Sequence, residues 1–264
     1  MNEQAALDRF ALYYDLEYGE YDDDLSLYYT YLTAVASQPA RVLELGCGSG
    51  RLLLALAEAG CAVLGVDASP AMLRRAETKL SRMAGAQFAL VAGRMESLAL
   101  AADYRADLVI VALNTFQYLT SVAQQQACLR AVRPHLAAEG RLILTLPGPA
   151  NWPDFLGTPG GLLLQGTYAD PSTGGYVQKW FSSSFDPASQ LEQVSFIYDA
   201  VAEDGSLRRL LAPLTLRHSF RYELEHLLTT CGYAVEAIYG DYAGGEFDGG
   251  SEHMVFVATT TEPG

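Results

Sequence analysis

The chain has 264 residues, half of them apolar, which is enough to bury one large core. Its 31 acidic residues outnumber its 17 basic residues, and the net charge of −14 disfavours binding to nucleic acids and to anionic membrane surfaces. The sequence has no apolar run of membrane-spanning length and no signal peptide, and its four scattered cysteines suit a reducing compartment, so we expect a cytoplasmic protein without a metal site.

The first forty residues have a helical pattern that is rich in tyrosine. Tyr14, Tyr18 and Tyr21 fall on one helix face, where aromatic side chains usually serve packing. The acidic run Asp22–Asp24 precedes a second helical pattern, and we expect it to cap that helix. We therefore treat residues 1–40 as an N-terminal helical lid.

From residue 41 to residue 148, short apolar runs alternate with helical patterns, which is typical of a parallel sheet. The apolar runs cover residues 42–45, 62–66, 88–92, 107–113 and 142–146. Ser69 and Ser121 stand where helix N-caps belong, and Pro134 should kink the helix that contains it. Right-handed crossovers between such strands predict a doubly wound sheet with helices on both faces.

The composition and periodicity of the sequence change after the fifth apolar run. Residues 147–161 are rich in proline and glycine, which predicts a loop, and residues 162–217 alternate apolar and polar side chains in several runs. We interpret residues 149–217 as an inserted antiparallel sheet that contacts substrate, covers the site or forms a homodimer. Two final strands flank the loop 241–252 and must pair antiparallel, and we expect that loop to be a solvated connection.

The segment Glu44–Gly50 joins the first strand to the first helix and contains three glycines. Glycines at this turn let a ligand touch the backbone, and Asp67 ends the next strand, as in nucleotide-binding folds. A dinucleotide site requires a further glycine where this chain has Arg51. The carboxylate of Glu44 also disfavours a diphosphate and favours a cationic ligand.

These residues carry a resemblance to a known family. Residues 42–50 resemble motif I of the class I S-adenosylmethionine-dependent methyltransferases, and the later motifs follow in order at 64–70, 93–96, 106–114 and 140–146. Tyr14-Asp15-x-x-Tyr18 and Leu113-Asn114-Thr115-Phe116 resemble the small-molecule branch that includes glycine/sarcosine and aminosugar N-methyltransferases. The resemblance implies a Rossmann-like α/β fold with a seven-stranded sheet whose last strand is antiparallel. Its methyltransferase domain would comprise residues 41–148 and 218–264.

The resemblance also implies the cofactor, S-adenosylmethionine, and the residues that hold it. Glu44 would lie near the amino group, Asp67 would accept bonds from the ribose hydroxyls, and Glu96 would contact the adenine amine. Tyr14 would close over the cofactor, and Asn114 would flank the sulfonium. The full set of cofactor residues implied is Tyr14, Glu44, Gly46, Cys47, Gly48, Gly50, Arg51, Asp67, Ala68, Met72, Arg94, Met95, Glu96, Leu113 and Asn114.

The implied reaction is a direct displacement that yields S-adenosylhomocysteine and needs no covalent intermediate and no metal. An amine nitrogen is the first expectation for the methyl acceptor. Relatives place a histidine where this chain has Tyr118, so the proton acceptor is Tyr118, His218, or water before binding. The expected substrate contacts are Tyr18, Phe116, Gln117, Tyr168 and Trp180.

Three alternatives stay open at this point. A small-molecule O-methyltransferase would use the same motifs. An NAD(P)-dependent oxidoreductase would share the strand, glycine loop and helix, although Glu44 and Arg51 argue against it. A non-catalytic protein that binds S-adenosylmethionine would keep the cofactor motifs without the chemistry.

Overall fold

The computed structural model describes residues 8–35, 38–151, 161–170 and 173–261. The chain divides into two compact units, which we describe separately. The core unit comprises residues 22–152 and 219–264, and the sheet unit comprises the described parts of residues 1–21 and 153–218. The first forty residues are thus shared between the two units, and the lid role expected for residues 1–40 stays a prediction.

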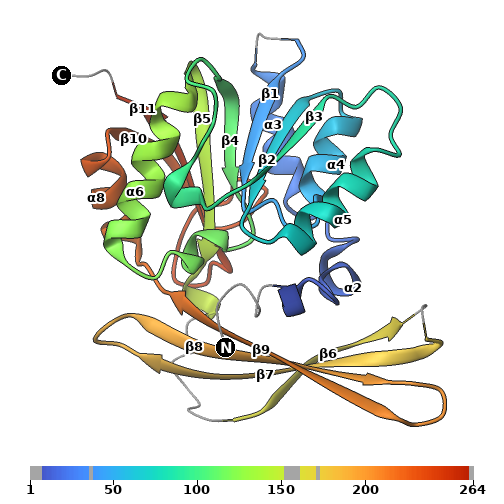
Figure 1. Ribbon diagram of the computed structural model, residues 1–264. Helices are drawn as coiled ribbons and strands as arrows, with labels where there is room; N and C mark the ends of the chain where they lie inside the picture. The colour runs from blue at the N-terminus through green and yellow to red at the C-terminus, as the bar shows by residue number, and fades with distance from the viewer. Residues whose placement is uncertain (1–7, 36–37, 152–160, 171–172, 262–264) are drawn as a thin grey trace. The chain divides into compact units, whose positions relative to one another are not determined.

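A seven-stranded sheet forms the centre of the core unit (Figure 1), in the order β10-β11-β5-β4-β1-β2-β3. Its strands are β1 (Arg41–Leu45), β2 (Ala62–Asp67), β3 (Phe88–Ala92), β4 (Ala106–Val111), β5 (Leu136–Pro147), β10 (Tyr233–Tyr239) and β11 (His253–Thr260). Strands β1 to β5 are parallel to one another, whereas β11 is antiparallel to both β5 and β10. The expected Rossmann-like sheet with an antiparallel last strand is confirmed.

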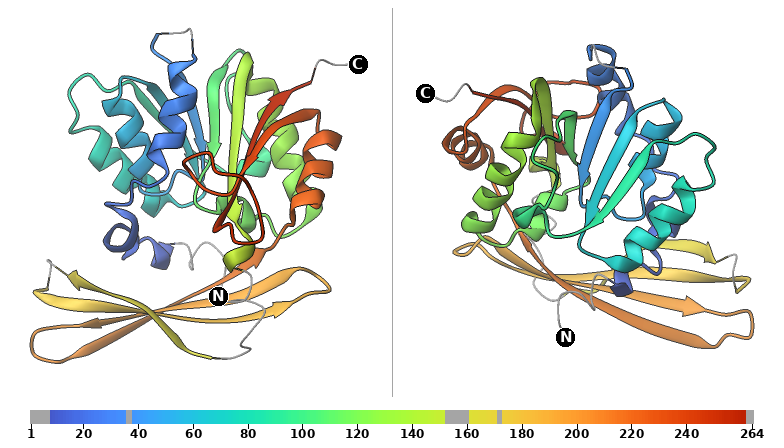
Figure 2. Two further views of the ribbon diagram at one scale, coloured as in Figure 1. Left: turned by 180° about the vertical axis from the view of Figure 1, so that it is seen from behind. Right: turned by 45° about the horizontal axis from the view of Figure 1, so that its top comes forward.

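Helices cover both faces of this sheet (Figure 2). They are α3 (Leu25–Thr33), α4 (Arg51–Glu58), α5 (Pro70–Leu80), α6 (Val122–Val132) and α8 (Arg221–Thr230), with short 3₁₀ turns η1 (Met95–Ser97), η2 (Thr115–Tyr118), η3 (Arg133–His135) and η4 (Pro149–Asn151). The apolar sides of α6 and α8 pack with Leu43, Leu45 and Leu144 in the main core on one face. Helices α3, α4 and α5 lie on the other face. Among the described helices, none has both the length and the apolar character needed to cross a bilayer.

The helix caps follow the sequence pattern closely. The Ser69 hydroxyl accepts a hydrogen bond from the Met72 N–H at 3.3 Å, and Ser121 accepts one from the Gln124 N–H at 3.2 Å. Pro134 does not kink α6, which ends at Val132 and gives way to η3. The reason is that proline cannot continue the hydrogen-bond ladder of the helix.

The sheet unit contains a four-stranded antiparallel sheet in the order β6-β7-β8-β9, which confirms the predicted insertion. The strands are β6 (Leu163–Asp170), β7 (Gly175–Asp186), β8 (Leu191–Val201) and β9 (Leu207–Arg217), and the short helix α2 (Tyr14–Tyr18) belongs to the same unit. Lys179 pairs with Tyr198 and Phe181 with Phe196 across β7 and β8, so these side chains share one face. Most of the predicted loop 147–161 falls outside the described residues.

The parallel strands fix where a ligand site can form. The carboxyl ends of β1 to β5 meet at one edge of the sheet, and the strand order reverses at β1, which lies between β2 and β4. In open α/β sheets, ligands bind in the crevice beyond these ends. The loops that follow β1, β2, β3 and β4 carry most of the residues predicted from the sequence to hold the cofactor.

Candidate active site

Hydrogen bonds and close contacts bring three of the predicted segments together at the carboxyl edge. The N–H of Gly48, in the loop after β1, donates to Asp67 Oδ2 at the end of β2, at 2.8 Å. Gly46 lies directly against Thr115 in the turn after β4, because a Cβ built on Gly46 would stand 2.2 Å from Thr115 Cγ2. The loop after β1 therefore contacts both the end of β2 and the turn after β4 within the core unit.

The glycines of this loop are needed for its backbone path. Gly46, Gly48 and Gly50 have φ values of +67°, +54° and +78°, in the left-handed region that favours glycine. Gly50 is the N-cap of α4, and a Cβ there would stand 2.8 Å from the Ala76 Cβ of α5. The loop thus leaves the N–H groups at the start of α4 open to a ligand beside tightly packed backbone.

Glu44 lies next to this loop with its carboxyl group buried. Its side chain is 4% exposed, and within the described residues its Oε2 has no hydrogen-bond partner. Burial raises the pKa of Glu44 well above its usual value; the nearby Arg51 lowers it, and Asp24 and Asp67 raise it further. A buried acid without a full set of partners is costly, which indicates a site prepared for a cationic group.

Arg51 is held by an acid that the sequence pattern did not identify. Its guanidinium donates to both oxygens of Asp24, at 2.8 and 2.6 Å, and Asp24 is fully buried. The expectation that Asp24 caps its helix is wrong, because it makes no side-chain cap bond to α3. The side chain of Arg51 is occupied by this pair, so any cofactor contact it makes would come from its backbone.

Asp67 is bound from two sides, and this fixes its orientation. Oδ2 accepts from the Gly48 N–H, and Oδ1 accepts from the Ser69 N–H at 2.7 Å. Each carboxylate oxygen keeps a second lone pair, and burial raises the pKa of Asp67 despite these two bonds. Ala68 is half-buried next to it, and Met72 is buried in the first turn of α5.

The turn after β3 contains an ion pair. Arg94 Nε donates to Glu96 Oε1 at 2.5 Å, with the Glu96 side chain 15% exposed. Met95 packs partly against the main core. A contact between Glu96 and the adenine amine would therefore use the other carboxylate oxygen, Oε2, or would require Glu96 to release Arg94.

The turn after β4 is the most strained part of this edge. Leu113 and Asn114 have φ values of +46° and +63°, which residues other than glycine rarely adopt. Such conformations persist where the surrounding structure enforces them, often at ligand sites. Within the described residues, the buried Asn114 Oδ1 has no partner. This atom is a second polar group prepared for a ligand.

The residues of η2 differ in how accessible they are. Phe116 is fully buried in the main core, where its ring serves packing, and its substrate contact stays a prediction. Gln117 is 4% exposed, and Tyr118 at the end of the turn is half-buried. Tyr118 is the most accessible of these three, and its role as a proton acceptor stays a prediction.

The remaining predicted residues lie in the sheet unit. The rings of Tyr14 and Tyr18 in α2 pack 4.8 Å apart, and Tyr168 and Trp180 are half-buried on β6 and β7. His218 is 6% exposed, and its Nε2 lies 2.8 Å from Glu192 Oε2. This burial favours a structural role for His218, whereas the roles predicted for the four aromatic residues stay predictions.

The sheet unit also contains a buried ion pair that the sequence pattern did not indicate. Lys179 is 2% exposed and donates to Glu17 of α2, with its ammonium 4.4 Å from the centre of the Phe196 ring. Burial lowers the pKa of Lys179, and Glu17 opposes this effect. Alternating apolar residues predicted this face, but a lysine in such a pattern gave no signal of its burial.

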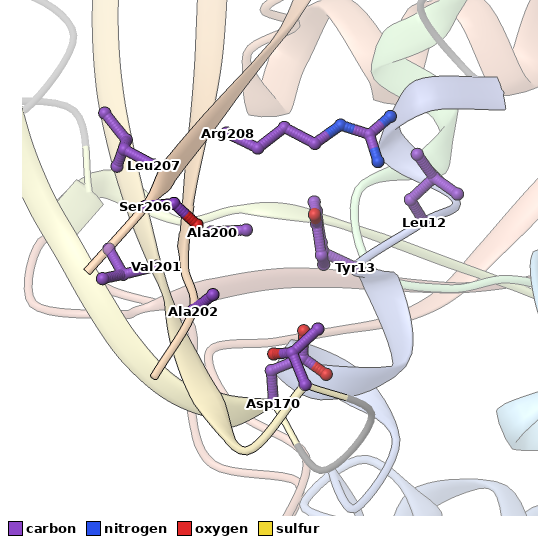
Figure 3. A pocket seen from close by; sticks show the side chains of 10 residues that line it. Leu12, Tyr13, Asp170, Ala200, Val201, Ala202, Ser206, Leu207 and Arg208 are labelled. Carbon is purple, nitrogen blue, oxygen red and sulfur yellow. The ribbon is translucent and has the colours of Figure 1, made fainter. Parts of the chain in front are cut away.

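A separate pocket of about 390 Å³ lies in the same unit (Figure 3). In this view the side chain of Arg208 extends toward Leu12 above Tyr13, and Asp170 lies below Tyr13. The lining residues are Leu12, Tyr13, Asp170, Thr173, Ala200, Val201, Ala202, Ser206, Leu207 and Arg208. The pocket contains none of the residues predicted to bind cofactor or substrate.

Comparisons with known proteins agree with this geometry. Residues 42–140 match a sequence family described as a methyltransferase domain. A putative methyltransferase, YqeM, from Bacillus subtilis (strain 168) is 25% identical over 258 residues, 94% of this chain and 95% of that protein. A cypemycin N-terminal methyltransferase from Streptomyces sp is 38% identical over 112 residues, 42% of this chain and 43% of that protein.

A solved structure extends the similarity to the whole chain. The CcbJ methyltransferase from Streptomyces caelestis superposes with a TM-score of 0.81 at 27% identity, covering 99% of this chain and 100% of that chain. The matched region 42–140 contains the glycine loop, Asp67 and the strained turn. The sheet order, the glycine loop and these matches indicate that the chain is an S-adenosylmethionine-dependent methyltransferase with a Rossmann-like fold.

Proposed function

We propose that this enzyme methylates the nitrogen of a small amine and holds S-adenosylmethionine at the carboxyl edge of the seven-stranded sheet. The observation that carries the proposal is the buried carboxyl group of Glu44, whose Oε2 has no partner among the described residues. A cationic amino acid moiety satisfies this acid, whereas a diphosphate in the same place meets a like charge.

The residues around the glycine loop fit this cofactor. Two buried oxygens, Glu44 Oε2 and Asn114 Oδ1, are prepared to accept hydrogen bonds at its methionine end. Asp67 is held rigidly and has lone pairs for the ribose hydroxyls. Met72 and Met95 would line the adenine, and Gly46 and its neighbouring glycines admit the ligand close to the backbone.

When bound, S-adenosylmethionine would supply a methyl group that its sulfonium activates for transfer to the acceptor. The protein's part is to fix the acceptor in near-attack geometry, and such positioning contributes roughly 7–11 kcal/mol in model reactions. The site must also exclude water, because the reaction disperses a positive charge. Strained turn residues such as Leu113 and Asn114 suit this task, since their conformation is already set before a ligand arrives.

Two observations favour an amine as the acceptor. The net charge of −14 attracts cationic substrates, and an amine is cationic in water before it binds. The cypemycin relative is named as an N-terminal methyltransferase, and it shares 38% identity over 112 residues with this chain. An O-methyl acceptor is the alternative that the same cofactor site would serve.

The proposal is tested with isotopically labelled S-adenosylmethionine and matched acceptor pairs. Each pair joins a small amine to its hydroxyl counterpart, for example glycine with glycolate and glucosamine with glucose. We expect labelled methyl groups on amines alone, with stoichiometric S-adenosylhomocysteine. Label on the hydroxyl members alone would show that the acceptor is a hydroxyl group and would overturn the proposed amine acceptor. Cofactor binding without methyl transfer to any acceptor would overturn the proposed activity.

A further inference from the structure

The core unit contains a histidine at the carboxyl edge of its sheet that neither the sequence motifs nor the proposed cofactor site uses. His253 is the first residue of β11 and pairs with Pro147, the last residue of β5. Its backbone N–H donates to the Gly240 carbonyl at 3.1 Å, which fixes the start of the strand. This edge is the one from which the glycine loop emerges.

The direction of the His253 side chain follows from the alternation of β11. Met254 and Phe256 belong to the main core on the face covered by α6 and α8. Because successive side chains point to opposite faces, His253 lies with Val255 on the other face. Glu44 is on that face too, because its neighbours Leu43 and Leu45 belong to the main core.

The surroundings of His253 suit a proton acceptor. The ring is half-buried and packs on the Tyr242 ring at 4.4 Å between centroids. Burial lowers the pKa of His253, against the opposing effects of four acids, and this favours the neutral imidazole. The four acids are Glu252, Asp24, Asp241 and Asp23. The same acids attract a cationic amine and stabilise the imidazolium once a proton has arrived.

The other three histidines are placed less suitably. His135 lies in η3 before β5, at the opposite edge of the sheet. His226 is exposed in the middle of α8, and His218 is buried against Glu192 in the sheet unit. Only His253 combines the carboxyl edge, a half-exposed ring and acidic neighbours.

We propose that His253 is the general base that removes a proton from the acceptor amine before methyl transfer. An ammonium has no lone pair, so it cannot attack until this proton is lost. The proton passes to a ring nitrogen of His253; the amine lone pair then forms the N–C bond while the C–S bond breaks with its electrons going to sulfur. The imidazolium afterwards releases its proton to solvent. This inference rests on the proposed amine methylation.

The test compares His253→Gln with His226→Gln as a surface control and His218→Gln as the rival base. Glutamine keeps hydrogen-bonding groups at the site but cannot titrate. At neutral pH we expect kcat/KM of His253→Gln to fall by about 10²- to 10³-fold, within the range of general-base catalysis. The loss should shrink as the pH rises toward the pKa of the amine, because free amine then arrives from solution. The affinity for S-adenosylhomocysteine should change less than twofold.

A second readout is the titration of His253 in the wild-type enzyme, which does not require a folded variant. In the wild-type enzyme, the imidazole resonance of His253 should titrate with the pKa that sets the acid limb of the kcat/KM profile. A mismatch of more than one unit, or a His253→Gln profile that follows the wild type, would overturn the inference while leaving amine methylation intact. Failure of the wild type to methylate any amine would overturn the proposed function and this inference with it.

Discussion

Asp24 and Arg51 form a two-pronged ion pair in the core unit, with both side chains almost completely buried. Asp24 ends the segment before α3, whereas Arg51 begins α4 directly after the glycine loop. The pair therefore fastens the first helix of the unit to the loop that is proposed to hold the cofactor. It also places one positive and one negative charge close enough to Glu44 to affect its pKa.

Replacing Asp24 by asparagine should destabilise the core unit, since Arg51 keeps its charge in a buried place without an ionised partner. Loss of one member of a buried pair costs about 3–5 kcal/mol, so we expect an effect near the lower limit because asparagine still accepts one bond. Urea unfolding measures this effect. Asp23→Asn, an exposed neighbour, is the control and should change the stability by less than about 0.5 kcal/mol.

The same substitution should change the titration of Glu44. Asp24 raises the pKa of Glu44 and Arg51 lowers it, so removing the Asp24 charge lowers that pKa. Binding of S-adenosylmethionine by Asp24→Asn should then persist to lower pH than in the wild type. An unchanged pH dependence would contradict the electrostatic link between the two acids.

Glu44→Gln should separate stability from binding. The folded-state pKa of Glu44 is raised by burial, so its stabilising contribution is present below the usual glutamate pKa and is lost as the pH rises through the raised value. The glutamine variant avoids that loss, and its free form should melt at a higher temperature than the wild type at neutral pH. Melting curves of both proteins, recorded from acidic to neutral pH, check the direction.

Binding should respond in the opposite sense to Glu44→Gln. A hydrogen bond to a charged group contributes about 1.5–3 kcal/mol, so the affinity for S-adenosylmethionine should fall about 10- to 100-fold. Wild-type affinity should itself weaken as the pH falls and Glu44 becomes protonated. A glutamine variant that binds as tightly as the wild type would remove Glu44 from the site.

Gly46→Ala should damage both the fold and the site, because it adds a Cβ 2.2 Å from Thr115 Cγ2 at a φ of +67°. Gly85→Ala is the matched control: its φ is +80°, and nothing lies within 4 Å of the added atom. We expect about 1 kcal/mol of destabilisation in the control and about 1–3 kcal/mol more in Gly46→Ala.

The steric part of the Gly46→Ala effect can be relieved. Thr115→Ser deletes the offending methyl group and keeps the hydroxyl, and the next nearest Thr115 atom is 3.4 Å from the added Cβ. The double variant should recover most of the additional loss in unfolding free energy. If the double variant recovers none of the lost unfolding free energy, the contact between Gly46 and Thr115 does not cause the destabilisation.

The Glu17–Lys179 pair predicts a different outcome in the sheet unit. Glu17→Ala leaves the buried Lys179 without its partner and should cost about 3–5 kcal/mol, whereas Glu17→Gln with Lys179→Met should be close to neutral. The folded pKa of Lys179 is lowered, so its contribution is present above the usual lysine pKa and is lost as the pH falls through the lowered value. Stability of Lys179→Met relative to the wild type should therefore decrease toward alkaline pH.

The sequence predicted those parts of the fold that depend on local patterns. The five parallel strands, the Ser69 cap and the glycine loop each have a signature within a few residues, and sheet topology then places Asp67 next to Gly48. The antiparallel insertion followed from period-two alternation. These features required no knowledge of contacts between distant side chains.

The features that the sequence did not reveal all depend on distant contacts. From the local sequence, Asp24 was equally consistent with a helix cap. Its side chain instead pairs with Arg51, a residue far along the chain, and makes no cap bond. Phe116 lies in a motif, and its burial in the core depends on helices far along the chain. The local sequence did not indicate a role for His253, because Asp24, one of the acids that act on its pKa, is more than 200 residues away in the chain.

Calorimetric titration of the wild-type protein with S-adenosylhomocysteine and with NADH, repeated with Glu44→Gln, tests the central claim most directly. We expect one equivalent of S-adenosylhomocysteine to bind, a loss of about 10-fold or more in the variant, and no measurable binding of NADH. Binding of NADH in preference to S-adenosylhomocysteine, or affinity for S-adenosylhomocysteine that ignores Glu44, would contradict the account.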